Sequence, residues 1–222
     1  MMRFMTKVMA YLVAVSCFYL PISTGAAEKA VPPENAFDQD TQKMIQAARK
    51  GQQYRDESGN DLVQDADARM RDAVEGKYHL SVAETTAARQ LLKEDNSLIV
   101  RWAANVLLAG DDPVIADDAV EADKRVLGKL DFKLLKNREQ TFGLIINHMC
   151  LSYLIGKVGA NPKVDQQGLV NKIIPLLKKD FEFETGRGFW PLHDAMAHCG
   201  EPGLDAVLAL MLKQVGKRPT WG

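Results

Sequence analysis

Side chains that can bind a metal ion or transfer a proton are concentrated in two short stretches of the C-terminal third of the chain. They are His148, Cys150, His193, His198 and Cys199. Zinc accepts imidazole and thiolate ligands, so a zinc site that uses His148, His193 and His198 is one hypothesis. The spacing argues against it, because residues one or two apart on a helix diverge and the chain has no CxxC or HExxH pair. We therefore expect no metal and no other cofactor.

An acid–base pair is the other chemistry that these residues allow. Asp194 precedes His198 by four residues, and a carboxylate at that helical spacing can orient an imidazole. An enzyme centred on Asp194, His198 and His148 is thus the alternative hypothesis. The simpler interpretation is a surface contact between Asp194 and His198, with His148 hydrogen-bonded in the core. Because the chain has no GxSxG motif, glycine-rich phosphate loop or calcium loop, we expect a protein that is not an enzyme.

The cysteines suggest a covalent link. Cys150 and Cys199 are the only two that remain if the first 26 residues are removed. An even pair in an exported protein favours a disulfide. Both residues fall on helical segments that would be neighbours if helix pairs stack in chain order, so we expect a Cys150–Cys199 bond. Two buried free thiols are the alternative.

The N-terminus has the three parts of a secretory signal peptide. Arg3 and Lys7 give a basic start, and residues 8–20 form an apolar run that is too short to span a membrane comfortably. Small residues then precede a cleavage site after Ala26 or Ala27. We therefore expect an exported protein, periplasmic or secreted, in which 1–26 is the signal peptide.

Two alternatives keep the N-terminus at the membrane. One is an anchor formed by an uncleaved N-terminal helix, and the other is a lipid attached to Cys17, although the residues around Cys17 resemble a lipoprotein box poorly. After cleavage no stable membrane insertion is expected, because no other stretch reads as long and apolar enough. The net charge of −1 and the absence of a basic cluster argue against nucleic-acid binding.

The remainder of the chain predicts helices only. Residues 27–37 are expected to be a polar linker, and 38–222 a single all-α domain. Ser81 and Glu84 form a capping box, and Pro175 should kink the helix that contains it. The predicted helices lie at about 38–54, 61–75, 81–94, 97–110, 114–128, 138–156, 166–179, 191–199 and 204–212.

Two stretches, 98–126 and 189–212, share a pattern of paired helices. Aligning Ala104 with Ala195 places Leu108 on Cys199, and a glycine ends the first helix of each pair. This pattern resembles the HEAT-type (armadillo-like) helical repeat. The resemblance implies a short right-handed α-solenoid of stacked antiparallel helix pairs, and a surface that binds another protein. An irregular helical bundle is the alternative fold.

Binding surfaces are therefore the remaining candidates for function. The connection 180–190 is rich in aromatic residues, and Arg187, Phe189 and Trp190 could anchor a partner, as could Arg101 and Trp102. The alternative is that these aromatics only seal the core. We expect an exported, non-enzymatic protein-binding module, such as an inhibitor, an immunity protein or an assembly factor that acts on another envelope protein.

Overall fold

A computed structural model describes residues 33–130, 138–177 and 191–215 of this chain. The chain divides into two compact units, and all described residues belong to the second, Pro33–Gly222. Within these ranges the secondary structure is helical and contains no strand, which confirms the all-α class. The predicted signal peptide, both cleavage sites and Cys17 lie outside the described residues.

The described residues form the following helices in chain order. Their bounds are η1 Pro33–Ala36, α2 Gln39–Arg49, α3 Leu62–Val74, α4 Val82–Leu91, α5 Ser97–Leu107, α6 Val114–Lys129, α7 Arg138–Gly159, α8 Gln166–Ile173, η2 Ile174–Leu176, α10 Pro191–Ala197 and α11 Gly200–Val215. The two stretches that resemble repeats correspond to the pairs α5–α6 and α10–α11. Each of these two pairs is therefore a helix, a short connection and a second helix.

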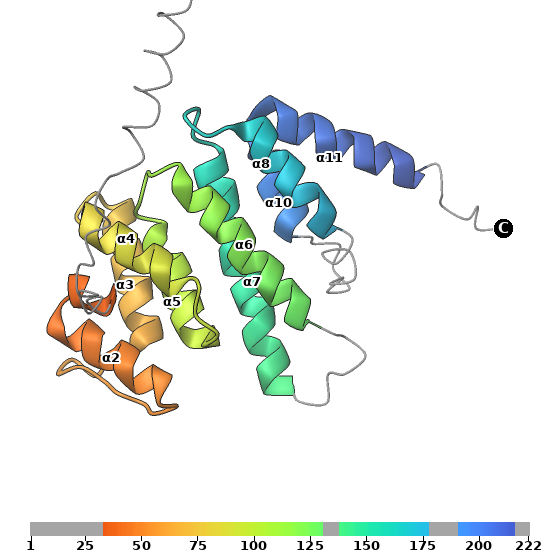
Figure 1. The fold of residues 1–222 in the computed structure, drawn as a ribbon. Helices are drawn as coiled ribbons and strands as arrows, with labels where there is room; N and C mark the ends of the chain where they lie inside the picture. Colours follow the sequence, from red (N-terminus) through yellow and green to blue (C-terminus); the bar gives the residue numbers. More distant parts are fainter. Residues whose placement is uncertain (1–32, 131–137, 178–190, 216–222) are drawn as a thin grey trace, which may run out of the picture. The chain divides into compact units, whose positions relative to one another are not determined.

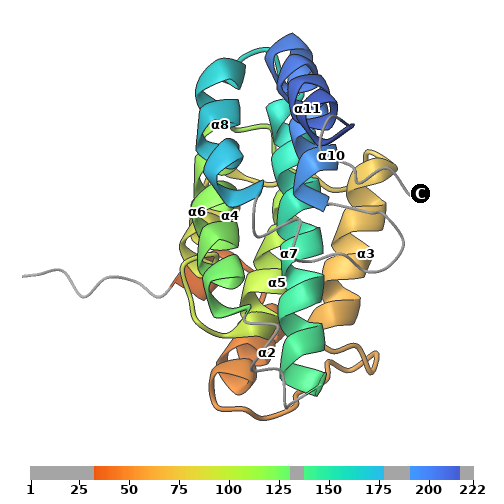
Figure 2. The same cartoon turned by 90° about the vertical axis from the view of Figure 1, so that its right-hand side faces the viewer.

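Successive helices from α3 onward alternate between two rows. The first row contains α3, α5, α7 and α10, in which each helix packs against the next (Figures 1 and 2). The second row contains α4, α6 and α8; α6 packs against α7 and α8, and an ion pair between Arg89 and Asp118 joins α4 to α6. The helix α11 ends the chain's described part and contacts α8 and α10.

Within the first row, α5 and α7 run parallel. The side-chain amide of Asn147 donates to the Ser97 carbonyl at 2.9 Å, and Lys157 Nζ donates to the Gly110 carbonyl at 3.0 Å. Both contacts join residues about 50 apart in sequence. Because this separation is nearly the same at both ends of the pair, the two helices run in the same direction.

The α7–α10 contact is close and also parallel. A Cβ atom built on Gly156 would lie 3.1 Å from Ala195 Cα, and one built on Gly159 would lie 2.5 Å from Cys199 Sγ. These contacts join residues 39 and 40 apart, so the register of α10 on α7 is set by two glycines. Their missing side chains let the two helices approach at van der Waals distance.

Local signals in the sequence start and end several helices as predicted. Ser81 and Glu84 form the expected capping box at α4, and the Asn96 side chain accepts hydrogen bonds from the first turn of α5. Before Pro175 the α8 helix ends at Ile173, and a 3₁₀ turn follows, because proline cannot donate the next backbone hydrogen bond.

The stretch predicted as a polar linker, 27–37, is packed at its end. Residues Pro33–Ala36 form η1, where the buried Glu34 carboxylate pairs with Arg49 at 2.5 Å. Phe37 is also buried, with its ring edge-on to Trp102 at 4.8 Å between centroids. The folded domain therefore extends at least to Pro33, because one apolar ring and one paired carboxylate anchor this segment.

The helix α7 is the longest described helix and is largely apolar. Its segment Phe142–Gly159 is, among the described residues, the one stretch long and apolar enough to cross a membrane, with a mean hydropathy of 1.2. The expectation that no such stretch follows the N-terminus was therefore too strict. Half of this segment is buried among the other helices, which is the pattern of a core helix.

The connection between α10 and α11 differs from the predicted turn. Gly200 adopts φ +70°, as expected for a residue that ends a helix, but α11 begins at Gly200 itself. Pro202 and Gly203 consequently lie in the first turn of α11, where a proline is tolerated. A Cβ atom built on Gly203 would lie 1.9 Å from the Met196 carbonyl oxygen.

Substitution of this glycine tests the α10–α11 packing. Gly203→Ala is expected to lower the free energy of unfolding by about 1–3 kcal/mol, because α11 must move away from the α10 backbone. Gly128→Ala in α6 is the control: a Cβ atom added there would have no neighbour within 4 Å, so alanine should raise stability by about 0.5 kcal/mol. Urea denaturation measures both, and equal effects would contradict this packing.

Candidate binding groove

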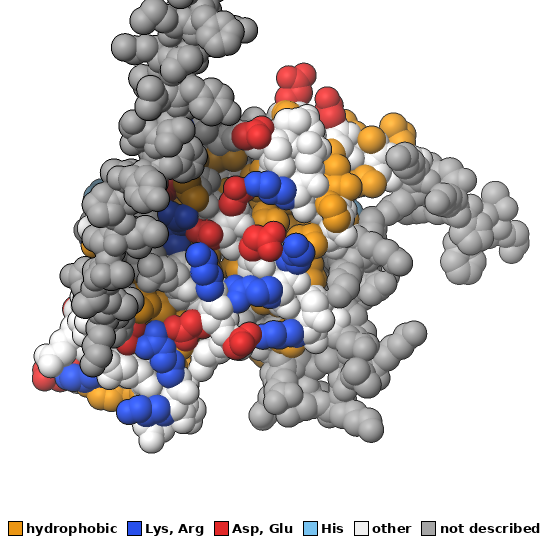
Figure 3. Space-filling model, viewed as in Figure 1, with side chains coloured by type: hydrophobic (Ala, Val, Ile, Leu, Met, Phe, Trp, Pro, Cys, Tyr) orange, Lys and Arg blue, Asp and Glu red, His pale blue; other side chains and the backbone are white. Residues whose placement is uncertain are grey.

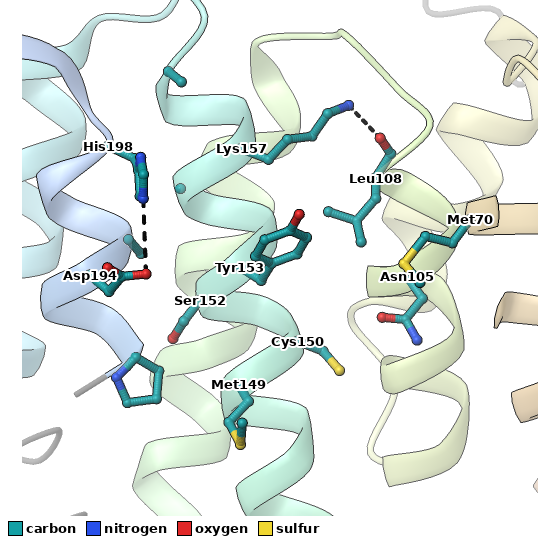
Figure 4. A pocket seen from close by; sticks show the side chains of 14 residues that line it. Met70, Asn105, Leu108, Met149, Cys150, Ser152, Tyr153, Lys157, Asp194 and His198 are labelled. Atoms are coloured by element: carbon teal, nitrogen blue, oxygen red, sulfur yellow. Dashed lines mark hydrogen bonds and ion pairs between the residues drawn. The ribbon is translucent and has the colours of Figure 1, made fainter. Parts of the chain in front are cut away.

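An apolar cavity of about 540 Å³ opens on the first row of helices. Its walls come from α3, α5, α7, the turn that follows α7, and α10 with the turn that follows it (Figure 4). A second cavity of about 500 Å³ adjoins it and shares four of its lining residues, Met70, Leu108, Tyr153 and Lys157. We call the two cavities together the α7 groove.

Exposed apolar side chains of α7 form the floor of the groove. Tyr153 is 66% exposed and Met149 is 42% exposed, and both occupy one face of the helix (Figure 4). The sequence does not single out either residue, because α7 is apolar on nearly every side, a pattern that predicts neighbours on more than one face. Large apolar side chains left exposed in a groove are typical of binding surfaces.

Lys157 joins α7 to the C-terminal end of α5 beside the groove. Its ammonium donates to the carbonyl oxygens of Leu108 and Gly110, which follow the last turn of α5. A cation at a helix C-terminus satisfies carbonyls that lack a helical partner and opposes the helix dipole. The side chain thus stabilises the wall rather than standing free for chemistry.

Two polar side chains in the groove wall lack hydrogen-bond partners in the described part of the chain. Ser152 is 1% exposed and its hydroxyl makes no hydrogen bond. Asn105 is 8% exposed, and its side-chain amide, for which no hydrogen bond occurs among the described residues, borders the cavity. Buried polar groups are normally satisfied, so the unbonded Ser152 hydroxyl beside the cavity indicates where a ligand atom could bind.

The opposite row carries charge instead. Lysine, arginine, aspartate and glutamate side chains are intermixed over α6 and the adjoining side of α8 in Figure 3. Several form ion pairs across helices, such as Arg89 with Asp118 at 2.5 Å and Lys172 with Asp117 at 2.7 Å. This mixture is typical of a solvated face, and it separates the two rows by chemistry.

The two residues of α5 that were predicted to contact a partner, Arg101 and Trp102, differ in their exposure to solvent. Trp102 is fully buried, and its Nε1 donates to Asp65 Oδ2 at 2.8 Å. The prediction that Trp102 contacts a partner is therefore wrong, because its ring fills the core between α5, α3 and Phe37. Arg101 is partly exposed on the side of α5 near Cys150 and remains a candidate.

The three histidines do not converge on one point. His148 is fully buried and its Nδ1 lies 2.7 Å from Asp123 Oδ1 on α6, which confirms the interpretation as a hydrogen-bonded core histidine. His193 is buried in α10, whereas His198 is exposed beside the groove. Across the described ranges, no group of three or more His, Cys, Asp or Glu residues could hold a metal ion.

The predicted acid–base pair is a surface contact. His198 Nε2 lies 4.0 Å from Asp194 Oδ2, and both side chains are 64% exposed (Figure 4). This pair lines the groove, but His148 bonds to the second row and does not. The three residues of the enzyme hypothesis therefore do not form one site.

Cys150 and Cys199 are free thiols in the structure, so the predicted disulfide is absent. The reason is the register of α10 on α7. Cys199 lies against Gly159, which is nine residues and about 13 Å of helix beyond Cys150. A disulfide requires Cα atoms within about 7 Å.

Burial also makes both thiols slow nucleophiles. Desolvation raises the pKa of the Cys199 thiol to about 11 and raises that of Cys150 as well. Because the thiolate is the reactive form, alkylation by iodoacetamide should still be accelerating at pH 9 for both residues. Mass spectrometry of peptides should detect alkylated Cys150 and Cys199 when the protein is labelled after denaturation, and little labelling of either residue when it is labelled folded. A mass two daltons lower and no labelling would instead indicate a disulfide.

The other predicted binding residues, Arg187, Phe189 and Trp190, lie outside the described residues. Comparisons with protein-family models, with curated proteins and with solved structures found no match to this chain.

Proposed function

We propose that this protein is an exported, non-enzymatic module that binds another protein through the α7 groove. The observation that carries the proposal is the groove itself: an apolar cavity in one row of helices, while the other row is charged. Binding surfaces characteristically combine an apolar centre with a polar rim. Met70 and Met149 in the lining add side chains that adapt to different partner shapes.

The fold proposal is a short solenoid of stacked helix pairs, as the HEAT-like resemblance implies. Its support is the alternation of helices between two rows and the parallel course of α5, α7 and α10, with contacts about 50 and about 40 residues apart. Stacked pairs of this kind present one row of helices as a continuous surface.

Export remains a proposal that rests on the N-terminal pattern of basic, apolar and small residues. A partner would therefore be another envelope or secreted protein. Inhibition of that protein and assistance in its assembly are both compatible with a groove of this kind. The separation of His148 from Asp194 and His198 favours binding over the enzyme alternative.

A cross-linking experiment tests the proposal at Tyr153. A photoreactive phenylalanine analogue at this position should form a covalent adduct with one partner in cells that produce the protein. The control position is Lys124 on α6, whose side chain is 60% exposed in the charged row and should form no adduct.

With the captured partner purified, Tyr153→Ala should raise the dissociation constant at least about tenfold, because exposed aromatic anchors dominate interface energies. Lys124→Ala should change it by less than about threefold. Equal cross-linking at both positions, or an unchanged dissociation constant in Tyr153→Ala, would contradict the proposal.

A further inference from the structure

One face of α5 connects the groove to a cation. Arg101, Asn105 and Leu108 recur at i, i+4 and i+7, so they share the stripe of α5 that borders the groove. Asn105 and Leu108 line the cavity directly. Arg101 lies one turn earlier, about 6 Å along the helix axis, on the side of Cys150.

Arg101 lacks the partner that other partly buried arginines have. Arg69 and Arg89 form ion pairs with carboxylates, and Arg125 donates to two backbone carbonyls. Arg101 forms none within the described ranges, and its Nε is buried without a hydrogen bond. The charges of Asp67 on α3 and of Arg101 both affect the pKa of the Cys150 thiol, but the two side chains form no ion pair with each other. Burying this N–H without an acceptor is costly, so a missing acceptor is indicated at Nε.

Asn105 offers donors toward the same place. In Figure 4 its amide and the Cys150 thiol face each other between α5 and α7. The amide supplies two N–H donors, and the guanidinium supplies up to five. A group that only accepts hydrogen bonds satisfies both at once.

Resting on the proposed function, we infer that Arg101 and Asn105 form a pocket for a carboxylate of the protein partner, with an adjacent apolar side chain of that partner on Tyr153. A carboxylate fits because it is planar, accepts two parallel hydrogen bonds from a guanidinium and carries one charge, which matches one cation. A phosphate dianion would leave excess charge beside apolar walls. The docking segment therefore carries an acidic residue next to an apolar one.

Sodium hexanoate is the first probe, with hexanamide as its uncharged match. In two-dimensional NMR spectra of the full chain, hexanoate should shift the Arg101 Nε–H and Asn105 side-chain amide signals saturably, and hexanamide should not. Arg101→Gln should abolish the shift at Asn105, and Arg101→Lys should weaken it. Arg55→Gln is the control, because Arg55 is an exposed arginine of the α2–α3 connection and lines neither cavity. Equal shifts with hexanamide, or loss of the response in Arg55→Gln, would overturn the inference.

The partner captured at Tyr153 provides the second test. Arg101→Gln should raise its dissociation constant at least about tenfold, with unchanged circular dichroism, and Arg55→Gln should leave it within threefold. If Tyr153 captures a partner that binds Arg101→Gln as tightly as the original protein, this inference fails and the proposed function stands. If Tyr153 captures no partner, the proposed function fails, and a hexanoate response would then show a carboxylate site of another purpose.

Discussion

Replacing Trp102 with alanine should lower the free energy of unfolding by about 3–5 kcal/mol. The ring is fully buried, so its removal leaves a cavity where α5 meets α3. It also removes the edge-on contact with Phe37 and the hydrogen bond from Nε1 to Asp65. Among the described residues, Trp102 is the largest fully buried side chain.

Trp102→Phe separates the two contributions. The smaller ring keeps most of the packing but cannot donate to Asp65, which retains its bond from Arg69 Nε at 3.0 Å. We expect a loss of about 1–3 kcal/mol, the cost of an unmade buried hydrogen bond with some lost volume. Urea denaturation followed by circular dichroism gives both values. A loss below about 1 kcal/mol for Trp102→Ala would show that this residue is not part of the core.

Asp123→Ala should cost about 3 kcal/mol or more, because it leaves the buried imidazole of His148 without its carboxylate. Both side chains are fully buried between α6 and α7, where water cannot replace the lost partner. The contact also joins the two rows of helices, so its loss should loosen α6 on α7.

Asp117 on the same helix is the matched control. Its ion pair with Lys172 is as short, at 2.7 Å, but both side chains are more than half exposed. Asp117→Ala should therefore change stability by about 0.5 kcal/mol or less. Asp123→Asn keeps the shape and one hydrogen bond and should fall between the two. Equal losses for Asp117→Ala and Asp123→Ala would refute the role assigned to the buried pair.

Features that depend on neighbouring residues along the chain were predictable. The capping box of Ser81 and Glu84, the cap at Asn96 and the end of α8 before Pro175 all follow from interactions within one helical turn. Apolar periodicity likewise predicted the all-α class and the approximate bounds of the helices. Even His148 was correctly placed, because a histidine on an apolar helix needs a buried partner.

The groove was not predictable from composition. A helix that is apolar on all sides reads as buried on all sides, yet Tyr153 and Met149 of α7 face solvent. The same pattern is produced by a core neighbour and by a site for a partner. Conversely Trp102, which could have been either, is core because Phe37 and Asp65 arrive from distant parts of the chain.

The cysteines show most clearly what could not be predicted from the sequence, namely which residues of α7 and α10 lie side by side. Their even number and their positions on stacked helices determined only that a bond was chemically reasonable. Tertiary structure decided the register, since two glycines of α7 let α10 settle with Cys199 against Gly159 and not against Cys150. Helix formation depends on contacts three or four residues apart, which the sequence by itself determined. The register between helices depends on side-chain shapes about 40 residues apart, and these meet only in the folded chain.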